Sequence, residues 1–414
     1  MVVGLDIGTS NVRVVIGETD VDGRFRIIGT ASEKSSGMRN GNIVNIEAAS
    51  NVIRKAIENA EQNGGVDVHS VITDIGGEQI EGLNTTGKVA ISKKGRGSRE
   101  VDADDVRRVK ESAFAIKIPD DREILCDVCQ EFTVDDNRGV KDPINQIGYK
   151  LEGSFHIISA SRTTLQNIKS SVGRAGYFVD TILPKTLACS YSVVTKDERD
   201  LGSIIIDLGA GTTDILVILN DSPVFTDSVP VGGNMITQDI YIEKGISLAD
   251  AETLKIQSGS CWMENINPDE TVIVNGLGGR PPQEFPRSEL CEIITARMEE
   301  ILMIVRDKIM EGSTITRLAG NIILTGGGAN LDGIVELVQD VFGTSAVRVG
   351  FPEKMGGIEE DYAGPEWDAA VGLVIYGRGR ENSRTSKRTK KAKVVSSEKT
   401  GNLENIKKII KKFF

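Results

Sequence analysis

A turn motif that occurs twice, 201 residues apart, constrains the fold of this chain more than any other feature. Residues 3–17 read VGLDIGTSNVRVVIG and residues 204–218 read IIIDLGAGTTDILVI, each with two β-branched runs around a turn. Both segments are predicted to form β-hairpins. An aspartate precedes each turn, and Asp6 and Asp207 occupy equivalent positions. The repeat therefore predicts two similar lobes that begin with the same hairpin.

The two turns have the composition of a phosphate site. Turns rich in Gly, Ser and Thr present several backbone N–H groups and hydroxyls to one side, which suits phosphate oxygens. Two carboxylates that face a polyphosphate would repel it, so Asp6 and Asp207 predict an intervening Mg²⁺ held largely through water. The alternative for a single copy is an ordinary hairpin with Asp-x-Gly turn chemistry, and the repetition favours the phosphate site. The predicted phosphate contacts are Gly8, Thr9, Ser10, Asn11, Gly209, Ala210, Gly211, Thr212 and Thr213.

A third glycine cluster, ILTGGGANLDG at 323–333, lies between a predicted buried strand and a predicted helix. Gly326, Gly327 and Gly328 would let a flat group lie directly on the backbone. Alone this signal is weak, because many turns between a strand and a helix are rich in Gly. It is neither a Walker GxxxxGK loop nor a GxGxxG dinucleotide turn.

Helical spacing of apolar residues recurs along the chain. The segment at 82–157 differs from its surroundings, because it combines mixed charges with one predicted helix and short strands. We interpret it as an insertion between two halves of the first lobe. The predicted helices cover 47–63, 102–116, 163–176, 183–195, 235–259, 288–312, 330–342 and 368–376.

Charge is unevenly distributed. The whole chain has a formal net charge of -11, whereas residues 378–414 contain 13 Lys and Arg but only 3 Asp and Glu. An acidic body with a basic tail argues against general nucleic-acid binding and predicts one dedicated electrostatic contact at the end of the chain.

The cysteines predict no chemistry. Five Cys, an odd number in a long chain, indicate reduced thiols of a cytosolic protein. Cys126 and Cys129 have CxxC spacing, but no second pair exists, and His69 and His156 lie far away in the sequence. A zinc or redox role is the weaker alternative to buried strand residues. The first residues lack the features of a signal peptide, and no window reaches the ~18 apolar residues of a membrane-spanning helix.

The basic tail has two parts. Residues 378–401 combine like charges with almost no apolar content, which predicts a disordered linker. On a helix, residues 402–414 place their apolar side chains within an arc of about 140°, with lysines opposite, as in a helix that lies in a membrane interface. The alternative is a helix that docks in a groove of a protein. The predicted membrane contacts are Leu403, Ile406, Lys407, Ile409, Ile410, Lys411, Phe413 and Phe414.

The order of these motifs resembles the actin-like ATPase superfamily, and within it the FtsA family of bacterial cell-division proteins. Two phosphate motifs and an adenosine motif match the superfamily, and the similarity to FtsA runs over the whole chain. The matching segments are LDIGTSN (5–11), IIDLGAGTTD (205–214), ILTGGGAN (323–330), KDPINQIGYKLEG (141–153), SYSVVTKDERDLG (190–202) and DAAVGLVIYG (368–377).

The resemblance implies an α/β fold of two ribonuclease-H-like lobes, duplicated as in actin, with a family-specific inserted subdomain that mediates protein contacts. ATP and Mg²⁺ would bind between the lobes, beside hinge helices at 187–192 and 369–373. The implied boundaries are 1–81 and 158–189 for the first lobe, 82–157 for the insertion, 190–365 for the second lobe, 366–377 for the closing hinge helix, 378–401 for the linker and 402–414 for the terminal helix.

Further nucleotide contacts are implied in the second lobe. Glu252 and Lys255 resemble the pair that contacts the ribose, and an i,i+3 surface ion pair is the alternative. Gly233 and Asn330 complete the implied contacts.

Two departures from the superfamily bear on hydrolysis. Asn11 stands where many members carry Lys, although bacterial shape-determining actins also carry Asn there and bind ATP. Lys185, in LPKTLA, stands where relatives often place a Gln or Glu that orients the attacking water. A charged Lys cannot accept a proton from water, so we expect tight ATP binding with slow or absent hydrolysis.

The resemblance implies a scaffold that polymerises into filaments at the division site, on the inner face of the cytoplasmic membrane. It would tether the tubulin-like protein FtsZ, recruit later division proteins and contact anionic lipid. One alternative is a sugar kinase of the same fold, which would need an Asp as catalytic base and has no use for a membrane helix. Another is an actin homologue of pilus assembly.

Overall fold

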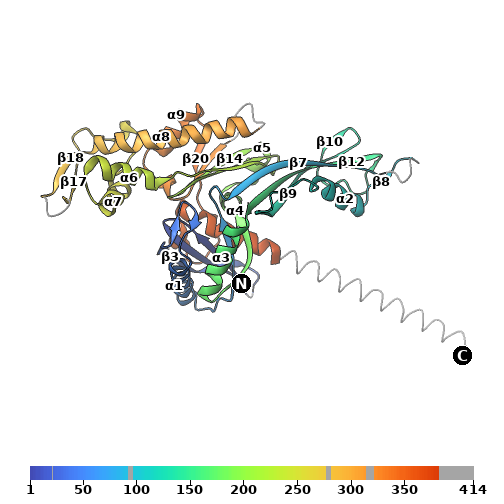
Figure 1. Cartoon of the computed structure of the whole chain (residues 1–414), viewed down its shortest axis with the longest axis horizontal. Coiled ribbons are helices and arrows are strands. Elements are labelled where there is room, and N and C mark those ends of the chain that lie inside the picture. The colour runs from blue at the N-terminus through green and yellow to red at the C-terminus, as the bar shows by residue number, and fades with distance from the viewer. Residues whose placement is uncertain (21, 92–96, 277–280, 314–320, 382–414) are drawn as a thin grey trace, which may run out of the picture.

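The structure is a computed structural model that describes residues 1–20, 22–91, 97–276, 281–313 and 321–381. In Figure 1 the second lobe and the inserted domain lie end to end, and the first lobe lies beneath their junction. Within these segments no helix combines the length and the apolar character needed to cross a bilayer. The predicted helix at 402–414, and the predicted linker beyond residue 381, lie outside the described residues.

The first lobe is a sheet with two helices on one face. Its elements are β1 (Val2–Ile7), β2 (Asn11–Thr19), β3 (Phe25–Lys34), β6 (Ser70–Ile75), β13 (Phe178–Pro184), α1 (Ile46–Gly64) and α3 (Arg162–Ala175). The strand order is β13-β6-β1-β2-β3, with β1 antiparallel to β2 and parallel to β6. Asn45 caps the start of α1 by accepting a hydrogen bond from the Ala48 amide, and Gly65 ends the helix with φ 65°.

β1 is buried along its whole length because both faces of the sheet are covered. Val3 and Leu5 pack with α1 and α3, whereas Val2 packs with a helix at 368–381. That helix approaches so closely that a Cβ at Gly4 would lie 2.4 Å from the carbonyl oxygen of Ala370. The glycine in this strand therefore serves packing between the sheet and the helix.

The second lobe repeats this design. Its strands are β14 (Ser203–Leu208), β15 (Thr213–Leu219), β16 (Ser222–Val229), β19 (Asn321–Thr325) and β20 (Val347–Val349). The order is β16-β15-β14-β19-β20, with β14 antiparallel to β15 and parallel to β19. β14 thus has the neighbours that β1 has in the first lobe, which confirms the predicted duplication and both predicted hairpins.

Helices surround the second sheet and join the lobes. They are α4 (Lys185–Val193), α5 (Lys196–Leu201), α6 (Gly233–Lys244), α7 (Leu248–Ser258), α8 (Arg287–Gly312) and α9 (Ile334–Phe342). A short hairpin, β17 (Thr271–Val274) and β18 (Gln283–Pro286), precedes α8. The large core of this lobe joins apolar residues of β14, β15 and β19 to those of α6 to α9.

The single helix predicted at 235–259 is wrong, because the segment forms α6 and α7. Gly245 adopts φ 59° and ends α6, and Ser247 caps α7 by accepting a hydrogen bond from the Asp250 amide. A left-handed glycine followed by an N-cap serine is a stop signal and a start signal in succession.

Three other predicted helix boundaries need correction. The helix predicted from 330 begins four residues later, because Gly333 has φ 79° and residues 327–330 form a 3₁₀ turn. The helix predicted from 183 begins at Lys185, because Leu183 and Pro184 belong to β13 and pair with β6. The linker predicted from 378 is helical as far as 381.

The inserted domain is a four-stranded sheet with one helix. Its elements are β7 (Ile80–Ala90), β8 (Arg99–Glu100), α2 (Ala103–Ala113), β9 (Arg122–Val134), β10 (Asn137–Val140), β11 (Ile147–Gly148) and β12 (Lys150–Ser161). The sheet order is β10-β9-β12-β7, and α2 packs on it with a small core of its own. β7 and β12 run through the predicted boundaries at 82 and 157.

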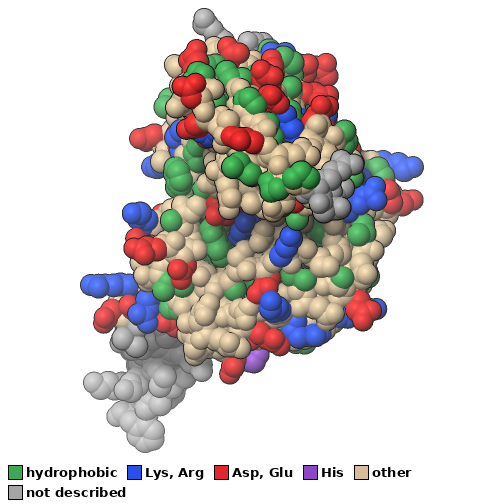
Figure 2. Space-filling model, turned by 90° about the vertical axis from the view of Figure 1, so that its left-hand side faces the viewer, with side chains coloured by type: hydrophobic (Ala, Val, Ile, Leu, Met, Phe, Trp, Pro, Cys, Tyr) green, Lys and Arg blue, Asp and Glu red, His purple; other side chains and the backbone are tan. Residues whose placement is uncertain are grey.

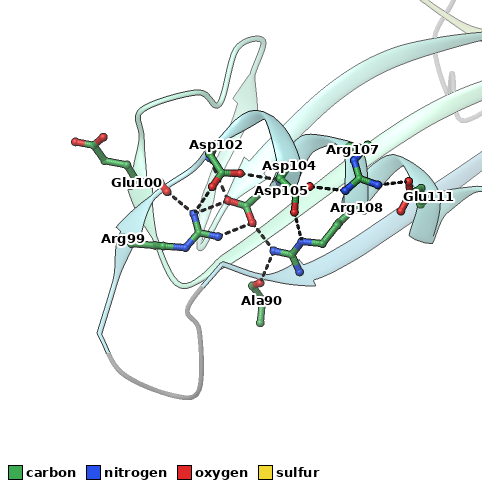
Figure 3. Close-up of polar contacts among 9 residues, drawn as sticks. All are labelled: Ala90, Arg99, Glu100, Asp102, Asp104, Asp105, Arg107, Arg108 and Glu111. Carbon is green, nitrogen blue, oxygen red and sulfur yellow. Dashed lines mark hydrogen bonds and ion pairs between the residues drawn. The ribbon is translucent and has the colours of Figure 1, made fainter.

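α2 begins with a polar cluster that the sequence did not single out (Figure 3). Asp102 and Asp105 form a capping box, in which each side chain accepts a hydrogen bond from the other residue's amide at 3.0 Å. The buried carboxylate of Asp105 also binds the guanidinium groups of Arg99 and Arg108. These four residues are called the α2 cluster below.

The inserted domain also packs against β16, the edge strand of the second lobe. His156 is 1% exposed, and its Nε2 lies 2.9 Å from the Thr226 hydroxyl while its Nδ1 lies 2.8 Å from Asn84 Oδ1. Gln130 donates a hydrogen bond to the Pro223 carbonyl at 3.0 Å. The inserted domain is therefore connected in sequence to the first lobe, but it packs on the edge strand of the second lobe and covers that edge.

Cys126 and Cys129 lie on β9, opposite Ile158 and Phe155 of β12. Their position on β9 confirms that they are strand residues, but both are only partly buried and not fully buried as predicted. Burial raises the pKa of Cys126 to about 12 and that of Cys129 to about 11, so neither is a reactive thiolate. No group of three or more His, Cys, Asp and Glu that could hold a metal occurs among the residues described.

Candidate nucleotide site between the lobes

The two predicted turns have the same geometry. In each, the first glycine donates its N–H to a carbonyl three residues later, from Gly8 to Asn11 and from Gly209 to Thr212, both at 3.0 Å. A Cβ on either glycine would lie 2.7 Å from that acceptor oxygen. Only glycine therefore fits the first position of each turn.

The turns also touch each other across the lobes. A Cβ at Gly211 would lie 2.8 Å from the Thr9 hydroxyl oxygen. Thr9 accepts a hydrogen bond at 3.0 Å from the amide of Gly41, which lies between β4 (Met38–Arg39) and β5 (Asn42–Ile43). The small hairpin of β4 and β5 thus holds the first turn, and the second turn packs directly on the first.

A cleft of about 470 Å³ opens beside the two turns. This volume lies in the range of small-molecule and cofactor sites. Figure 2, which faces the left side of Figure 1, shows Lys and Arg side chains at the level where the lobes meet. The predicted residues that line the cleft are Gly8, Thr9, Ser10, Asn11, Asp207, Gly209, Ala210, Thr213, Gly233, Glu252, Lys255, Gly326, Gly327, Gly328 and Asn330.

Three predicted residues lie outside the lining of this cleft. Gly211 and Thr212 line a smaller cavity of about 40 Å³ under the turns. Asp6 lines neither space, because it is 1% exposed beneath the first turn.

The third glycine cluster combines packing with an open surface. Gly326 adopts φ 80°, and a Cβ there would lie 2.1 Å from Asp207 Oδ1. A Cβ at Gly328 would lie 2.7 Å from the Cβ of Leu208. Gly327 is different, because a Cβ there would meet nothing within 4 Å. Gly326 and Gly328 are therefore required because they pack closely on β14. Of the three glycines, Gly327 is the one that leaves the backbone open toward the cleft.

Aspartates and one lysine lie beneath the turns. The ammonium group of Lys185, the first residue of α4, lies 3.4 Å from Asp6 Oδ1 and 3.5 Å from Asp207 Oδ2. Asp74 and Asp214 are buried nearby. These five residues are called the cleft cluster below. Burial of the ammonium lowers the pKa of Lys185, but the charges of Asp207, Asp6 and Asp74 together outweigh burial, so its pKa lies well above the ordinary value.

The pKa values of the other two aspartates in the cleft cluster are raised, whereas a carboxylate that is paired with a cation usually has a lowered pKa. Burial, and then the charge of Asp6, raises the pKa of Asp74 well above its ordinary value. Burial, and then the charge of Asp207, raises the pKa of Asp214 to about 6. The cluster therefore holds more negative charge than its surroundings neutralise.

The carboxylates beneath the turns suit the predicted Mg²⁺ only in part. Asp6 Oδ1 and Asp207 Oδ1 are buried and accept no hydrogen bond. Two such carboxylate oxygens fit a hydrated Mg²⁺ whose remaining ligands are water and phosphate. They do not form a cage made of protein ligands, and the ammonium of Lys185 already lies between the two side chains.

Glu252 and Lys255 both line the cleft and also form an ion pair of 2.7 Å. Lys255 donates further hydrogen bonds to the Thr237 hydroxyl at 2.8 Å and to the Gly233 carbonyl at 3.0 Å. The alternative of an i,i+3 ion pair and the predicted position beside the cleft are thus both correct. The ribose contact itself stays a prediction.

Several cleft residues were missed from the sequence. Arg13 lines the cleft and places its guanidinium 3.8 Å from Asp6 Oδ2. It lies two residues after Asn11 on β2, so the period of two in a strand could have identified it. Glu366, which accepts a hydrogen bond from Asn330 at 2.8 Å, comes from a segment 36 residues away and gave no local signal.

Comparison with known proteins identifies the family. A family model described as cell division protein FtsA matches residues 204–372, and one described as the SHS2 domain inserted in FtsA matches residues 77–159. The cell division protein FtsA of Borreliella burgdorferi is 39% identical over 97% of both chains. FtsA of Pseudomonas aeruginosa is 34% identical over 93% of this chain and 91% of its own.

Solved structures with the same fold are more distant in sequence. A PilM-PilN type IV pilus biogenesis complex matches with a TM-score of 0.64 and 16% identity, over 91% of this chain and 98% of that chain. MreB 5 of Spiroplasma citri, bound to AMPPNP, matches with a TM-score of 0.55 and 15% identity, over 93% and 98%. These matches confirm the predicted two-lobed actin-like fold. The relatives that align along nearly the whole chain decide between a sugar kinase, a pilus-assembly protein and a division protein: the chain belongs to the family of the cell division protein FtsA.

Proposed function

We propose that this chain is an ATP-binding, actin-like scaffold of cell division that assembles on the inner face of the membrane and anchors FtsZ there. The observation that carries the nucleotide part is the pair of equivalent glycine turns that face one cleft from opposite lobes. Backbone N–H groups from both turns can reach one polyphosphate, so a bound nucleotide would hold the lobes together. A structural relative, MreB 5, is described as bound to AMPPNP.

Each part of the cleft has a chemical role in this proposal. Thr9, Ser10 and Thr213 offer hydroxyls and amides to phosphate oxygens, and Gly327 leaves space for the base. Glu252 and Lys255 lie beside the ribose. Mg²⁺, when bound, would supply positive charge between the carboxylates of Asp6 and Asp207 and the phosphates.

Hydrolysis is slow or absent in this proposal. Lys185 keeps its proton because two carboxylates surround its ammonium, and a protonated lysine accepts no proton from water. Its charge would stabilise phosphate instead. The expected result is stoichiometric ATP binding with phosphate release far slower than the usual range of about 1–100 s⁻¹ for kinases. Rapid magnesium-dependent release would contradict this.

A direct test of nucleotide binding uses Gly327→Leu. Because a Cβ at this position would meet no heavy atom within 4 Å, we expect the variant to fold normally while the leucine occupies the cleft. Gly173→Leu is the matched control, since Gly173 is exposed on α3 and a Cβ there also meets nothing within 4 Å. We expect ATP affinity, measured by titration calorimetry, to fall on the order of a hundredfold in Gly327→Leu and to stay unchanged in Gly173→Leu, the loss of about 2.7 kcal/mol following from excluded contacts. Equal affinities in all three proteins would refute the nucleotide site.

The membrane part of the proposal depends on the predicted terminal helix. Partly immersed apolar side chains and four lysines near anionic lipid, at about 1 kcal/mol per Lys, must offset the cost of ordering a short helix. A single tail therefore holds weakly, and a filament with many tails would hold firmly by avidity. The predicted linker would let each helix reach the lipid.

Co-sedimentation with liposomes that contain anionic lipid tests this part. The full chain should pellet with them, more so with ATP if assembly adds avidity, whereas a chain of residues 1–400 should stay in the supernatant. Equal pelleting of both chains would remove the membrane claim. Addition of FtsZ to the same liposomes should co-pellet FtsZ only with the full chain.

A further inference from the structure

We propose that Lys185 is a built-in cation of the nucleotide site, which takes over part of the charge neutralisation that Mg²⁺ would supply and makes nucleotide binding depend only weakly on Mg²⁺. This inference rests on the proposed nucleotide site.

The position of the ammonium group carries the inference. Lys185 Nζ lies 3.4 Å from an oxygen of Asp6 on β1 and 3.5 Å from an oxygen of Asp207 on β14. One positive charge thus bridges the two equivalent aspartates of the two lobes. A divalent cation that neutralised both carboxylates would need the same place.

The lysine is held there by its own helix. Its side chain is only 19% exposed, and it lies at the first position of α4. α4 packs backbone to backbone on the helix at 368–381, since a Cβ at Gly372 would lie 1.9 Å from the Ala188 carbonyl oxygen. The stem of Lys185 also packs beside Gly76, whose added Cβ would lie 3.5 Å from Lys185 Cβ. These contacts fix the backbone and the Cβ of Lys185, and the carboxylates of Asp6 and Asp207 hold its ammonium in the cleft.

The local charge balance shows what the ammonium does. Four buried aspartates, Asp6, Asp74, Asp207 and Asp214, surround it. The remaining cation beside them within the described residues is Arg13, at 3.8 Å from Asp6. A triphosphate that enters the cleft adds further negative charge close to these carboxylates. Lysine is a compact point charge and reaches both carboxylates and phosphate from one atom, as a metal ion would.

The consequence is a reduced requirement for metal. An opposite charge within about 4–6 Å shifts the pKa of a charged group by one to three units, a tenfold to thousandfold change in its proton affinity, and this sets the scale for the effect of one fixed ammonium on a bound phosphate. With Lys185 in place, removal of Mg²⁺ should cost less than about tenfold in ATP affinity. Without it, Arg13 is the remaining cation of the described residues beside the aspartates, and Mg²⁺ would have to supply most of the neutralising charge.

The experiment measures ATP affinity of the full chain by calorimetry, with Mg²⁺ and with EDTA. Lys185→Met keeps the length of the stem and removes the charge. We expect this variant to lose less than about tenfold in ATP affinity in Mg²⁺ but on the order of a hundredfold in EDTA. Lys185→Arg, which restores a positive charge, should recover most of the binding in EDTA. Lys55→Met, at a surface lysine paired with Glu33, is the control and should behave as the native chain in both buffers.

A second readout needs no nucleotide. Mn²⁺, detected by its paramagnetic resonance, should bind Lys185→Met more tightly than the native chain, because the variant frees the carboxylates of Asp6 and Asp207. A native chain that loses a hundredfold or more in EDTA would overturn the inference and leave the nucleotide site intact. An equal loss in both buffers for Lys185→Met would also overturn it, because the lysine would then act independently of metal. No ATP binding by the native chain in either buffer would overturn both this inference and the proposed function.

Discussion

The cleft buries four aspartates beside basic side chains and the inserted domain buries one, Asp105, but the carboxylates of the two clusters have different partners. In the α2 cluster, both oxygens of Asp105 accept hydrogen bonds, from Arg99, Arg108 and the Asp102 amide (Figure 3). Burial alone would raise the pKa of Asp105, but these partners lower it to about 2. In the cleft cluster, Asp6 and Asp207 each retain a buried oxygen without a hydrogen bond.

The difference separates a structural cluster from a binding site. A buried carboxylate whose partners all come from the chain is complete, so its removal costs stability. A buried carboxylate with an unused oxygen is destabilising in the protein alone and is retained where a ligand completes it. The pKa of Asp74, whose Oδ2 is also buried without a hydrogen bond, is raised where that of Asp105 is lowered, and it follows the same division.

The largest expected effect concerns Asp105→Ala. Loss of this carboxylate leaves two guanidinium groups and the Asp102 amide without their shared partner, so the inserted domain should lose about 3 kcal/mol of stability. Hydrogen exchange of the α2 amides, measured by mass spectrometry, reports that loss. ATP affinity should not change, and a variant with native exchange rates would show that the cluster does not hold α2.

The next effect concerns His156 at the junction between the inserted domain and β16. Burial lowers the pKa of His156 to about 4, below the value of 6.5 for an exposed histidine. Its contribution to stability is therefore complete above pH 6.5 and is lost as the pH falls toward 4. Between pH 7 and pH 5 the protonation of His156 by itself should lower the free energy of unfolding by about 2 kcal/mol, a loss that Asp214, with its pKa raised to about 6, offsets in part.

Denaturant titrations at several pH values measure this slope. His156→Gln should remove it, whereas His69→Gln, at an exposed histidine, should retain it. If both variants kept the native slope, protonation of His156 would not weaken the junction.

A smaller effect of opposite sign is expected for Asp74→Asn. Asp74 Oδ2 is buried without a hydrogen bond, while its Oδ1 accepts one from the Ile7 amide at 3.4 Å. Its raised pKa means that the ionised form destabilises the fold above that pKa. The amide keeps one acceptor and removes the charge, so the melting temperature at pH 8 should rise, by an amount equivalent to about 1 kcal/mol. A lower melting temperature would contradict the contrast between the clusters.

The smallest effect is expected for Arg107→Ala. This arginine lies on α2 next to the α2 cluster and pairs with Asp104 and Glu111, but all three side chains are about 60% exposed. Exposed pairs contribute less than about 1 kcal/mol. The same hydrogen-exchange measurement should therefore detect almost no change, which makes this variant the control for Asp105→Ala. If Arg107→Ala lost as much protection from hydrogen exchange as Asp105→Ala, side-chain exposure would not explain which of these two residues stabilises α2.

The sequence contained most of the fold because its signals are local. The repeated hairpins and the helical spacing of α1 and α8 each depend on neighbouring residues, and these predictions were confirmed. The break between α6 and α7 was also present locally, as Gly245 followed by Ser247, but the apolar pattern on both sides hid it. The helix boundary at Lys185 was not local, since Leu183 and Pro184 are extended through their pairing with β6.

The site was predictable in its glycines and less so in its charges. The composition of the two turns and their repetition in the sequence predicted them. The contact of Lys185 with two aspartates, by contrast, joins three segments that are distant in the sequence, and only the packing of both lobes on α4 creates it. The same holds for the packing of the inserted domain on β16, which depends on His156 and Thr226 meeting across 70 residues.

A crystal structure of the full chain with a non-hydrolysable ATP analogue tests the account most directly. We expect the phosphate chain between the two turns, within hydrogen-bond distance of backbone amides at residues 9–11 and 210–212, with the ammonium of Lys185 beside Asp6 and Asp207. Phosphates bound elsewhere, or a nucleotide that contacts one lobe only, would contradict it.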